Sequence, residues 1–260
     1  MSERFQKSNI TAIVAAGGTI SGEYARVADC GIRTLARVGE QQLSVISVVT
    51  RALANSAHIT DVIVAGPPEI KPLLGDGIKY IPDYGSGPAN FFRTTRDHCT
   101  SDRILLCVSD LPFITESDID KFIQNAGAST DIVLGTVNKS DYLNAFPGSP
   151  QSTFTTVAGL GEVTMATIYL VNRAQLLKNE ELITQLIHSR KSQLKTAILL
   201  GPALVWQWIT GTLNIEKLIV CAEDLLHCTV SVVPNLSPNL AYDIDSIEDW
   251  KYANSNHIDV

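Results

Sequence analysis

Short apolar runs recur along the first half of the chain, and each ends in glycine, proline or polar residues. The first run, Ile10–Ala16 (ITAIVAA), is apolar on both faces, which is typical of a strand buried inside a parallel sheet. Four later runs have the same character: Asp61–Ala65, Ile78–Ile81, Arg103–Val108 and Asp131–Val137. We therefore predict that these runs form the strands of one buried sheet.

Between these runs the apolar residues change to helical spacing. Leu43–Leu53 (LSVISVVTRAL) predicts one helix and Asn90–His98 a second. Ser117–Asn125 predicts a third, which begins with Ser117 as its cap and has acidic residues in its first turn. This alternation of strands and helices predicts an α/β fold with a doubly wound, mostly parallel sheet. Ligands in such sheets bind outside the carboxyl ends of the strands.

The second half of the chain is less regular. A stretch rich in proline, glycine, serine and threonine, Phe146–Thr156, predicts an irregular excursion over residues 140–162 of a single domain that spans residues 1–260. The other predicted elements are a strand at Val163–Val171, a helix at Arg173–Arg190, a strand at Cys228–Val233 and a helix from Asp243 onward.

Composition narrows the function classes. Hydrophobic residues make up 45% of the chain and charged residues 18%, which is enough to build an ordinary core. The net charge of −7 argues against partners rich in phosphate, so we expect neither nucleic-acid nor membrane-surface binding. A small anionic ligand remains compatible with this charge, because backbone amides or a metal ion can hold it locally.

Two further features bear on the compartment. The five cysteines are scattered without a C-x-x-C pair, which indicates free thiols rather than a zinc site or a disulfide framework. Thr196–Ile215 carries no charge but contains Gly201-Pro202 and several polar side chains, so we predict a buried helix or a strand-turn-helix segment instead of a membrane span. With the polar N-terminal residues, these features predict a cytoplasmic protein.

The first predicted strand ends in a glycine-rich segment, Ala15–Tyr24 (AAGGTISGEY), which is compatible with more than one protein family. A P-loop is excluded, because Glu23 and Tyr24 stand where a lysine and a hydroxyl residue are required. The dinucleotide-binding pattern G-x-G-x-x-G does not match either. The segment is similar to the TGGTIAG signature of bacterial-type asparaginases, but Ala16 occupies the place of their nucleophilic threonine.

Three motifs follow one another along the chain. They are Ala15-Ala16-Gly17-Gly18 with Arg33-Thr34-Leu35 and Gly39, then Ser109-Asp110-Leu111-Pro112 at the end of a predicted strand, then Asp243-Ile244-Asp245 with Glu248-Asp249-Trp250. In this order they resemble the motifs of nucleotidyltransferases with a GT-A-like, Rossmann-like fold. The most similar group is the molybdenum-cofactor guanylyltransferase type, and the resemblance runs from Ile10 to Trp250.

The resemblance implies an enzyme that uses Mg²⁺ or Mn²⁺ to transfer a nucleoside monophosphate from an NTP to a phosphorylated or sugar-like small molecule, with release of pyrophosphate. It implies that Arg33 and Asp110 are catalytic, with Arg33 in the place of a lysine that contacts the phosphates. Asp110 and Asp245 would hold the metal ion, which prefers oxygen ligands, and Asp243 is a substitute for the second ligand. The predicted nucleotide-binding residues are Ala15, Ala16, Gly17, Gly18, Gly66, Pro67, Asp83, Gly87, Asn90 and Ser109.

Simpler explanations exist for several of these residues. The glycine pair Gly17-Gly18 is compatible with a tight turn, Asp110 with a turn cap and Arg33 with a solvated charge. Glu248 and Asp249 fit the first turn of a helix, where the helix dipole favours acidic side chains.

Two departures from the family pattern keep other functions open. Arg33 replaces the lysine, and Thr164–Thr167 lacks the Gly-Gly-Asn turn that relatives carry near the acceptor. A nucleotide-binding protein with little or no turnover is therefore an alternative. A nucleotide-sugar glycosyltransferase is another, although such enzymes usually carry a D-x-D motif at the metal. The sequence leaves open which base is bound and whether the protein forms a homodimer.

Overall fold

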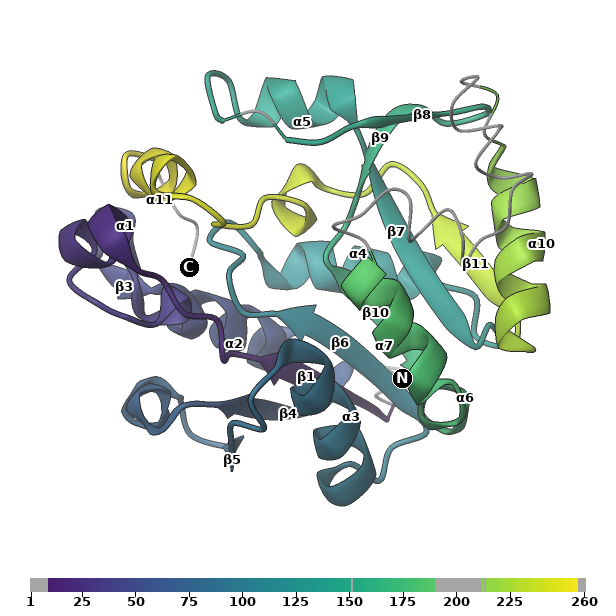
Figure 1. The fold of residues 1–260 in the computed structure, drawn as a ribbon, viewed down its shortest axis with the longest axis horizontal. Helices are drawn as coiled ribbons and strands as arrows, with labels where there is room; N and C mark the ends of the chain where they lie inside the picture. The colour runs from purple at the N-terminus through teal and green to yellow at the C-terminus, as the bar shows by residue number, and fades with distance from the viewer. Residues whose placement is uncertain (1–8, 151, 190–211, 213, 257–260) are drawn as a thin grey trace, which may run out of the picture.

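A mostly parallel sheet runs through the middle of the molecule, and helices cover both of its faces (Figure 1). The computed structural model describes residues 9–150, 152–189, 212 and 214–256. Within these residues the main sheet has nine strands in the order β5-β4-β1-β6-β10-β7-β9-β8, and β11 pairs with β7. The predicted doubly wound α/β fold is confirmed.

The bounds of the elements are as follows. The main sheet consists of β1 (Ile10–Ala15), β4 (Ile59–Gly66), β5 (Ile78–Pro82), β6 (Arg103–Val108), β7 (Ile132–Asn138), β8 (Thr155–Val157), β9 (Gly161–Met165), β10 (Ile168–Asn172) and β11 (Val230–Val233), and a separate ribbon pairs β2 (Arg37–Val38) with β3 (Leu43–Ser44). The helices are α1 (Gly22–Val27), η1 (Arg33–Leu35), α2 (Val45–Asn55), η2 (Pro68–Leu73), α3 (Gly87–His98), α4 (Glu116–Asn125), α5 (Lys139–Ala145), α6 (Arg173–Lys178), α7 (Glu180–Ser189), α10 (Ile215–Leu226), η3 (Pro238–Leu240) and α11 (Ile247–Asn254).

Successive residues of the central strands point into two different cores. Ala12 and Val14 of β1 belong to the core that α2 and α4 cover. Ile13, which lies between them, belongs to the core that α3, α6 and α10 cover. Because side chains alternate across a strand, a strand that is apolar at every position must be covered on both faces. This is why the run Ile10–Ala16 could be assigned to a buried strand.

One predicted strand is two strands in the structure. The run Val163–Val171 divides into β9, which pairs antiparallel with the end of β7, and β10, which lies between β6 and β7. The chain changes partners at Ala166, whose amide donates to the Gly135 carbonyl at 2.9 Å. The antiparallel β10 also interrupts the parallel order, a change of direction that a continuous apolar run does not reveal.

The starts of three helices also differ from the predicted ones. The cap of α4 is Thr115 rather than Ser117, because Thr115 and Asp118 form a reciprocal capping box. The last helix begins at Ile247 rather than at Asp243, with Ser246 as its cap. The α2 helix starts at Val45, since the preceding Leu43–Ser44 is strand β3.

One predicted helix is interrupted in the structure, and one stretch predicted to be irregular contains regular elements. The helix predicted at Arg173–Arg190 is two helices, α6 and α7, and Arg190 lies outside the described residues. The stretch 140–162 contains most of α5, all of β8 and the start of β9, so its irregular part is shorter than expected. Of the uncharged segment Thr196–Ile215, residues 196–211 and 213 lie outside the described part of the chain.

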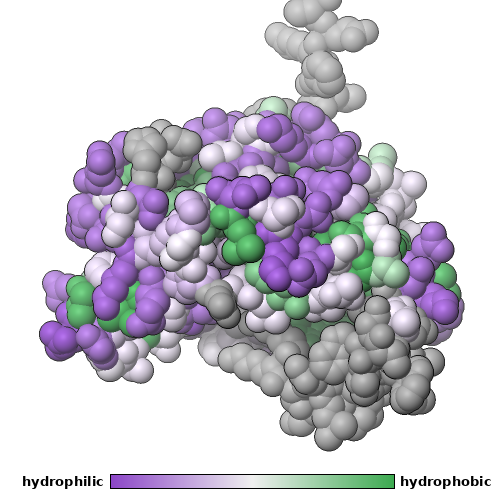
Figure 2. Space-filling view, turned by 90° about the horizontal axis from the view of Figure 1, so that it is seen from above, coloured by the Kyte–Doolittle hydropathy of each residue, from purple (hydrophilic) through white to green (hydrophobic). Residues whose placement is uncertain are grey.

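Large apolar side chains are scattered over the surface. Among the described residues five are well exposed, and each lies on a different element: Val27 on α1, Leu73 on η2, Leu143 on α5, Met165 on β9 and Val220 on α10. Figure 2 shows the same pattern on one face, where green residues form small groups between purple ones. Across the described residues, no helix has both the length and the apolar character needed to cross a membrane.

The parallel strands bring their carboxyl ends to one edge of the sheet. Ala15 at the end of β1 pairs with Ala65 of β4 on one side and with Val108 of β6 on the other. Ala65 pairs in turn with Ile81 of β5. The segments that follow these residues are therefore neighbours in space, and each of the four holds a glycine or a carboxylate predicted for the site.

Candidate functional site

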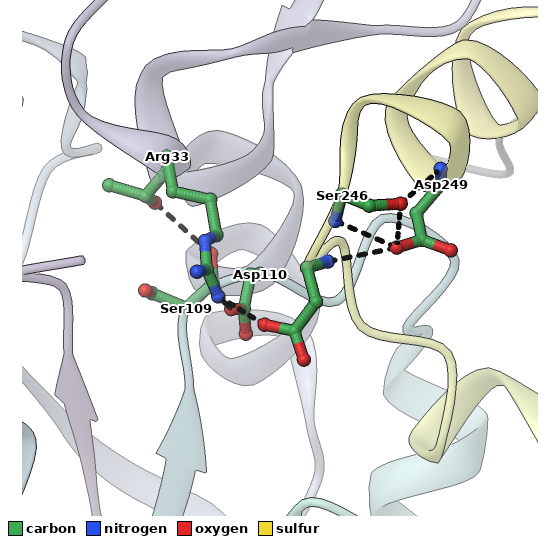
Figure 3. A network of polar contacts seen from close by, with 7 residues as sticks. Arg33, Ser109, Asp110, Ser246 and Asp249 are labelled. Atoms are coloured by element: carbon green, nitrogen blue, oxygen red, sulfur yellow. Dashed lines mark hydrogen bonds and ion pairs between the residues drawn. The ribbon is translucent and has the colours of Figure 1, made fainter. Parts of the chain in front are cut away.

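One arginine joins two predicted metal ligands at this edge (Figure 3). Nη1 of Arg33 donates to a carboxylate oxygen of Asp110 at 3.0 Å and to one of Asp245 at 2.6 Å. The side chain of Asp110 is 14% exposed and that of Asp245 is 69% exposed, so the arginine links the floor of the site to its rim. The structure thus brings together Arg33, Asp110 and Asp245, which come from three distant parts of the sequence.

Backbone contacts explain why these side chains converge. The amide of Arg33 donates to the carbonyl of Gly18 at 2.9 Å, which pins η1 against the glycine turn after β1. The amide of Ile244 donates to the carbonyl of Asp110 at 3.0 Å, so the C-terminal segment crosses the end of β6. The capping box at the start of α11 then orients Asp245, whose amide donates to Asp249 at 3.2 Å. The acidic Asp249 therefore stabilises a helix start, as the simpler explanation of the sequence held.

The electrostatics of the site follow from burial. Burial raises the pKa of the Asp110 carboxyl, and the Arg33 guanidinium opposes this shift. Burial also acts to lower the pKa of Arg33, but Asp110 and Asp245 outweigh it, so the pKa of Arg33 is raised. Asp243 has a pKa of about 7, raised first by burial and then by the charges of Asp110 and Asp245. The Arg33 guanidinium therefore favours the charged form of the Asp110 carboxyl, against the effect of burial.

Two atoms of this cluster have no partner. Oδ1 of Asp110 and Nε of Arg33 are buried, and neither has a hydrogen bond to any described residue. Buried polar atoms are nearly always paired in folded proteins, so unpaired ones at a sheet edge point to a ligand that completes them. A carboxylate oxygen calls for a cation or a donor, and an N–H group calls for an anionic oxygen.

The glycines at this edge differ in how much space a Cβ atom would have. A Cβ on Gly17 would lie 2.9 Å from a carboxylate oxygen of Asp83, so only glycine allows Asp83 to lie against the β1 turn. A Cβ on Gly66 would lie 2.7 Å from Ile70 and 3.0 Å from Ala16. A Cβ on Gly18 would make only ordinary contact with Arg33, at 3.8 Å. Gly17 and Gly66 therefore serve packing, whereas Gly18 leaves its backbone open on one side.

The loop after β5 holds Asp83 in a fixed orientation. Oδ1 of Asp83 accepts from the amide of Gly85 at 3.0 Å and from Nδ2 of Asn90 at 2.8 Å. Asn90 is fully buried and also accepts from the amide of Tyr84, at 2.7 Å. Asn90 therefore positions the loop, and the exposed Asp83 is the member of the pair that faces outward.

The remaining predicted nucleotide-binding residues occupy the same edge. Ala15 is partly buried and Ala16 fully buried, and the Ala16 amide donates to the carbonyl of Ala65 at 2.8 Å. Pro67 precedes η2, and Gly87 is the exposed first residue of α3. Ser109 is buried, and its carbonyl accepts from the hydroxyl of Thr34 at 3.1 Å.

Comparison with known proteins identifies the family of this chain. The family model of the MobA-like NTP transferase domain matches residues 12–194. The chain belongs to this family. No curated protein sequence matches it.

Solved structures show the same fold as this MobA-like NTP transferase domain. A hypothetical transferase from Thermus thermophilus has a TM-score of 0.81 and 22% sequence identity, over 93% of this chain and 99% of that chain. The 4-diphosphocytidyl-2C-methyl-D-erythritol synthase of Anaerococcus prevotii has a TM-score of 0.57 and 14% identity, over 96% of each chain. A CMP:2-keto-3-deoxy-manno-octonic acid synthetase complexed with CTP has a TM-score of 0.54 and 16% identity, over 93% of this chain and 94% of that chain.

Sequence reasoning missed Tyr24 of this MobA-like domain. It considered Tyr24 only as a residue that breaks the P-loop pattern, whereas the structure buries its side chain beside the Arg33 cluster. The available signal was its position, six residues after Gly18 and in the first turn of α1. Arg26, in contrast, is exposed and pairs with Glu23 at 3.8 Å.

Proposed function

We propose that this protein is a metal-dependent nucleotidyltransferase that transfers a nucleoside monophosphate from an NTP to a small sugar-like or phosphorylated acceptor. The observation that carries the proposal is the convergence of Arg33 on Asp110 and Asp245 at the carboxyl edge of the sheet, beside the backbone of Gly18. Nucleotidyl transfer is the activity of the family. Two of the structural neighbours are named as enzymes that make cytidine nucleotide derivatives of sugar-like molecules.

In the reaction, an oxygen of the acceptor forms a bond to the α-phosphorus, and the bond from that phosphorus to the α–β bridging oxygen breaks. Pyrophosphate leaves with the bridging oxygen and its electrons, and a hydroxyl acceptor also gives up its proton. The protein's task is to hold the triphosphate in line with the acceptor and to offset its negative charge. The backbone around Gly18 and the guanidinium of Arg33 supply amide and N–H donors for this task.

The residues present fit a Mg²⁺ ion. Mg²⁺ is commonly held by one or two carboxylates, with substrate phosphates and water completing its octahedron. Asp110 and Asp245 supply two carboxylates, and the unpaired Oδ1 of Asp110 is a vacant oxygen ligand. The described residues contain no group of three or more histidine, cysteine, aspartate or glutamate side chains that could hold a metal, so phosphate oxygens would complete the set. When bound, the ion would neutralise charge on the phosphates.

Arg33 would change partners when the substrate arrives. Its Nη1 lies between the two carboxylates that would hold the metal, so the guanidinium and the metal compete for the same oxygens. An NTP would offer Arg33 new anionic partners in exchange for these carboxylates. The arginine would therefore move from the carboxylates to the phosphates, and its planar fork suits phosphate recognition.

The test is release of pyrophosphate from each NTP with Mg²⁺ or Mn²⁺ and a panel of phosphorylated and sugar-like acceptors, with thermal shift measured in parallel. We expect one NTP to stabilise the protein in a metal-dependent way and to release pyrophosphate with a matching acceptor. Stabilisation without pyrophosphate would favour a binding protein with little turnover. No stabilisation by any nucleotide would overturn both functions.

Asp110→Ala provides the sharper arm of this test. It should abolish the metal-dependent part of the thermal shift, because it removes the buried ligand oxygen. Asp76→Ala, which removes an exposed carboxylate in the turn before β5, is the matched control and should leave the shift unchanged. A metal-dependent shift that survives in Asp110→Ala would show that the metal is held elsewhere.

A further inference from the structure

Three buried polar atoms without a partner gather at the Arg33 cluster. They are the hydroxyl of Tyr24, Nε of Arg33 and Oδ1 of Asp110, each of which lacks a hydrogen bond to any described residue. Two of them are donors and one is a carboxylate oxygen. The proposed function already uses Arg33 and Asp110, but it gives no role to Tyr24.

The fold holds Tyr24 firmly in this position. Its side chain is 8% exposed, and its ring lies 6.1 Å from the ring of Trp250 in the C-terminal helix α11. The segment before it is pinned to the segment that leads to Arg33, because Thr19 bridges to Ile32 and the amide of Ile20 donates to the carbonyl of Gly31 at 3.1 Å. Tyr24 therefore lies within a closed loop that starts at the glycine turn, and Arg33 lies at the end of that loop.

The charged groups that act on the Tyr24 hydroxyl identify its surroundings. They are those of Arg33, Asp110 and Asp249, with the Cys30 thiol beside them. Burial raises the pKa of Tyr24 above its ordinary range, and Arg33 opposes that shift. The hydroxyl is therefore neutral at physiological pH and has a proton to donate.

Packing alone does not account for this hydroxyl. A phenylalanine would keep the ring contact with Trp250, and it would avoid the cost of burying an unpaired O–H group. The hydroxyl lies among the groups that would receive the triphosphate, and an anionic oxygen is a strong acceptor for such a donor. A phosphate oxygen is thus a partner that suits the two donors, the Tyr24 hydroxyl and Nε of Arg33.

We propose that Tyr24 is a phosphate-binding residue of the nucleotide site, and that its O–H and the Nε–H of Arg33 donate to oxygens of the triphosphate. The proposal rests on the proposed function and adds a residue to it. All three atoms are covered while Arg33 is bonded to Asp110 and Asp245, so departure of Arg33 from the carboxylates would open them to the phosphates.

Tyr24→Phe tests the proposal, because it removes one oxygen and keeps the ring. Binding of the Mg²⁺ complex of the preferred NTP, measured by calorimetry, should weaken by roughly tenfold to a hundredfold, the range for a hydrogen bond to a charged group. Binding of the matching nucleoside, which has no phosphate, should not change. The melting temperature of the unliganded variant should equal or exceed that of the wild type, since no protein hydrogen bond is lost.

Tyr252→Phe is the matched control. The Tyr252 hydroxyl donates to the carbonyl of Pro147 at 3.2 Å, so its removal should lower the melting temperature and leave NTP binding unchanged. The role of Tyr24 would be overturned if Tyr24→Phe bound the NTP as tightly as the wild type. It would also be overturned if the unliganded Tyr24→Phe variant melted at a lower temperature than the wild type. If the wild-type protein bound no NTP, the proposed function and this role of Tyr24 would both be overturned. The wild-type titration therefore distinguishes failure of the proposed function from failure of the role of Tyr24 alone.

Discussion

Arg33 and Asp245 lie 2.6 Å apart across the site, although 212 positions separate them in the sequence. The contact closes the site by joining the loop after β1 to the segment before α11. A second contact, from the indole of Trp250 to the carbonyl of Arg37 at 2.8 Å, ties the same two regions together. The C-terminal segment is therefore part of the site, even though it lies beyond residues 12–194 that define the family match.

The first prediction concerns competition between Arg33 and the metal. Arg33→Gln removes the cation that now neutralises Asp110 and Asp245, so affinity for free Mn²⁺ without nucleotide should rise by about tenfold, since like charges at close range repel. Affinity for the NTP should fall, because a phosphate partner is lost. Electron paramagnetic resonance of free Mn²⁺, with and without NTP, measures both effects.

Arg51→Gln is the control for this experiment, because Arg51 is an exposed cation on α2. It should leave both affinities unchanged. An Arg33→Gln variant that binds free Mn²⁺ no better than the wild type would show that the guanidinium and the metal do not share the carboxylates.

The second prediction compares the two glycines of the first motif. Gly17→Ala places a Cβ 2.9 Å from Asp83, so it should destabilise the protein by about 1 to 3 kcal/mol as the loop shifts away. Gly18→Ala meets only ordinary contacts, the nearest at 3.8 Å, so the free energy of unfolding should change little. If phosphate approaches the backbone at Gly18, this variant should instead lose NTP affinity. Denaturant unfolding and NTP titration of both variants separate the two effects, and equal loss of stability in both would contradict the assignment.

The strands and the site motifs could be predicted from the sequence because their signals are local. The run Ile10–Ala16 is apolar at every position, and the structure covers β1 on both faces. Asp110 follows such a strand directly, so its place at the sheet edge follows from the parallel arrangement. Asp245 needed the family resemblance, because no local pattern places a C-terminal residue beside the end of β6.

What the sequence could not show depends on partners that are distant in the chain. The division of Val163–Val171 into β9 and β10 results from pairing with different parts of the sheet, which an apolar run does not encode. The burial of Tyr24 depends on Trp250, which reaches it from the last helix. The bond of Arg33 to both carboxylates likewise exists only in the folded chain, and under the proposed function it would make Arg33 compete with the metal for these oxygens.

The third prediction concerns pH. Asp243 has a pKa of about 7 in the folded protein, above its ordinary value of 3.8. A raised carboxyl pKa means that the folded state binds the proton more tightly, so this stabilisation is present below about pH 4 and is lost as pH rises toward 7. Between pH 5 and pH 8, Asp243 should lower the free energy of unfolding by roughly 2 to 3 kcal/mol when no metal is bound.

Asp243→Asn checks this assignment, because an amide does not titrate. With EDTA present, its free energy of unfolding should decline less than that of the wild type between pH 5 and pH 8. Asp224→Asn, which removes an exposed carboxylate on α10, should follow the wild-type curve. Parallel curves for the wild type and Asp243→Asn would mean that another group titrates in this range.

The last prediction concerns the nucleotide base. Oδ1 of Asp83 is held by Gly85 and Asn90, and no described residue bonds to Oδ2. If Oδ2 faces the base of the bound nucleotide, it would accept donors from it, and guanine alone among the common bases presents two adjacent donors, N1–H and the 2-amino group. GTP should therefore bind more tightly than ATP, CTP or UTP.

Asp83→Asn tests this preference. Its Oδ1 can keep both bonds, whereas Nδ2 becomes a donor, so GTP affinity should fall by roughly tenfold or more. Affinity for XTP should rise, because xanthine carries an oxygen in place of the amino group of guanine. Titration of wild type and variant with all five nucleotides measures this exchange, and an unchanged preference in Asp83→Asn would remove Asp83 from the base site.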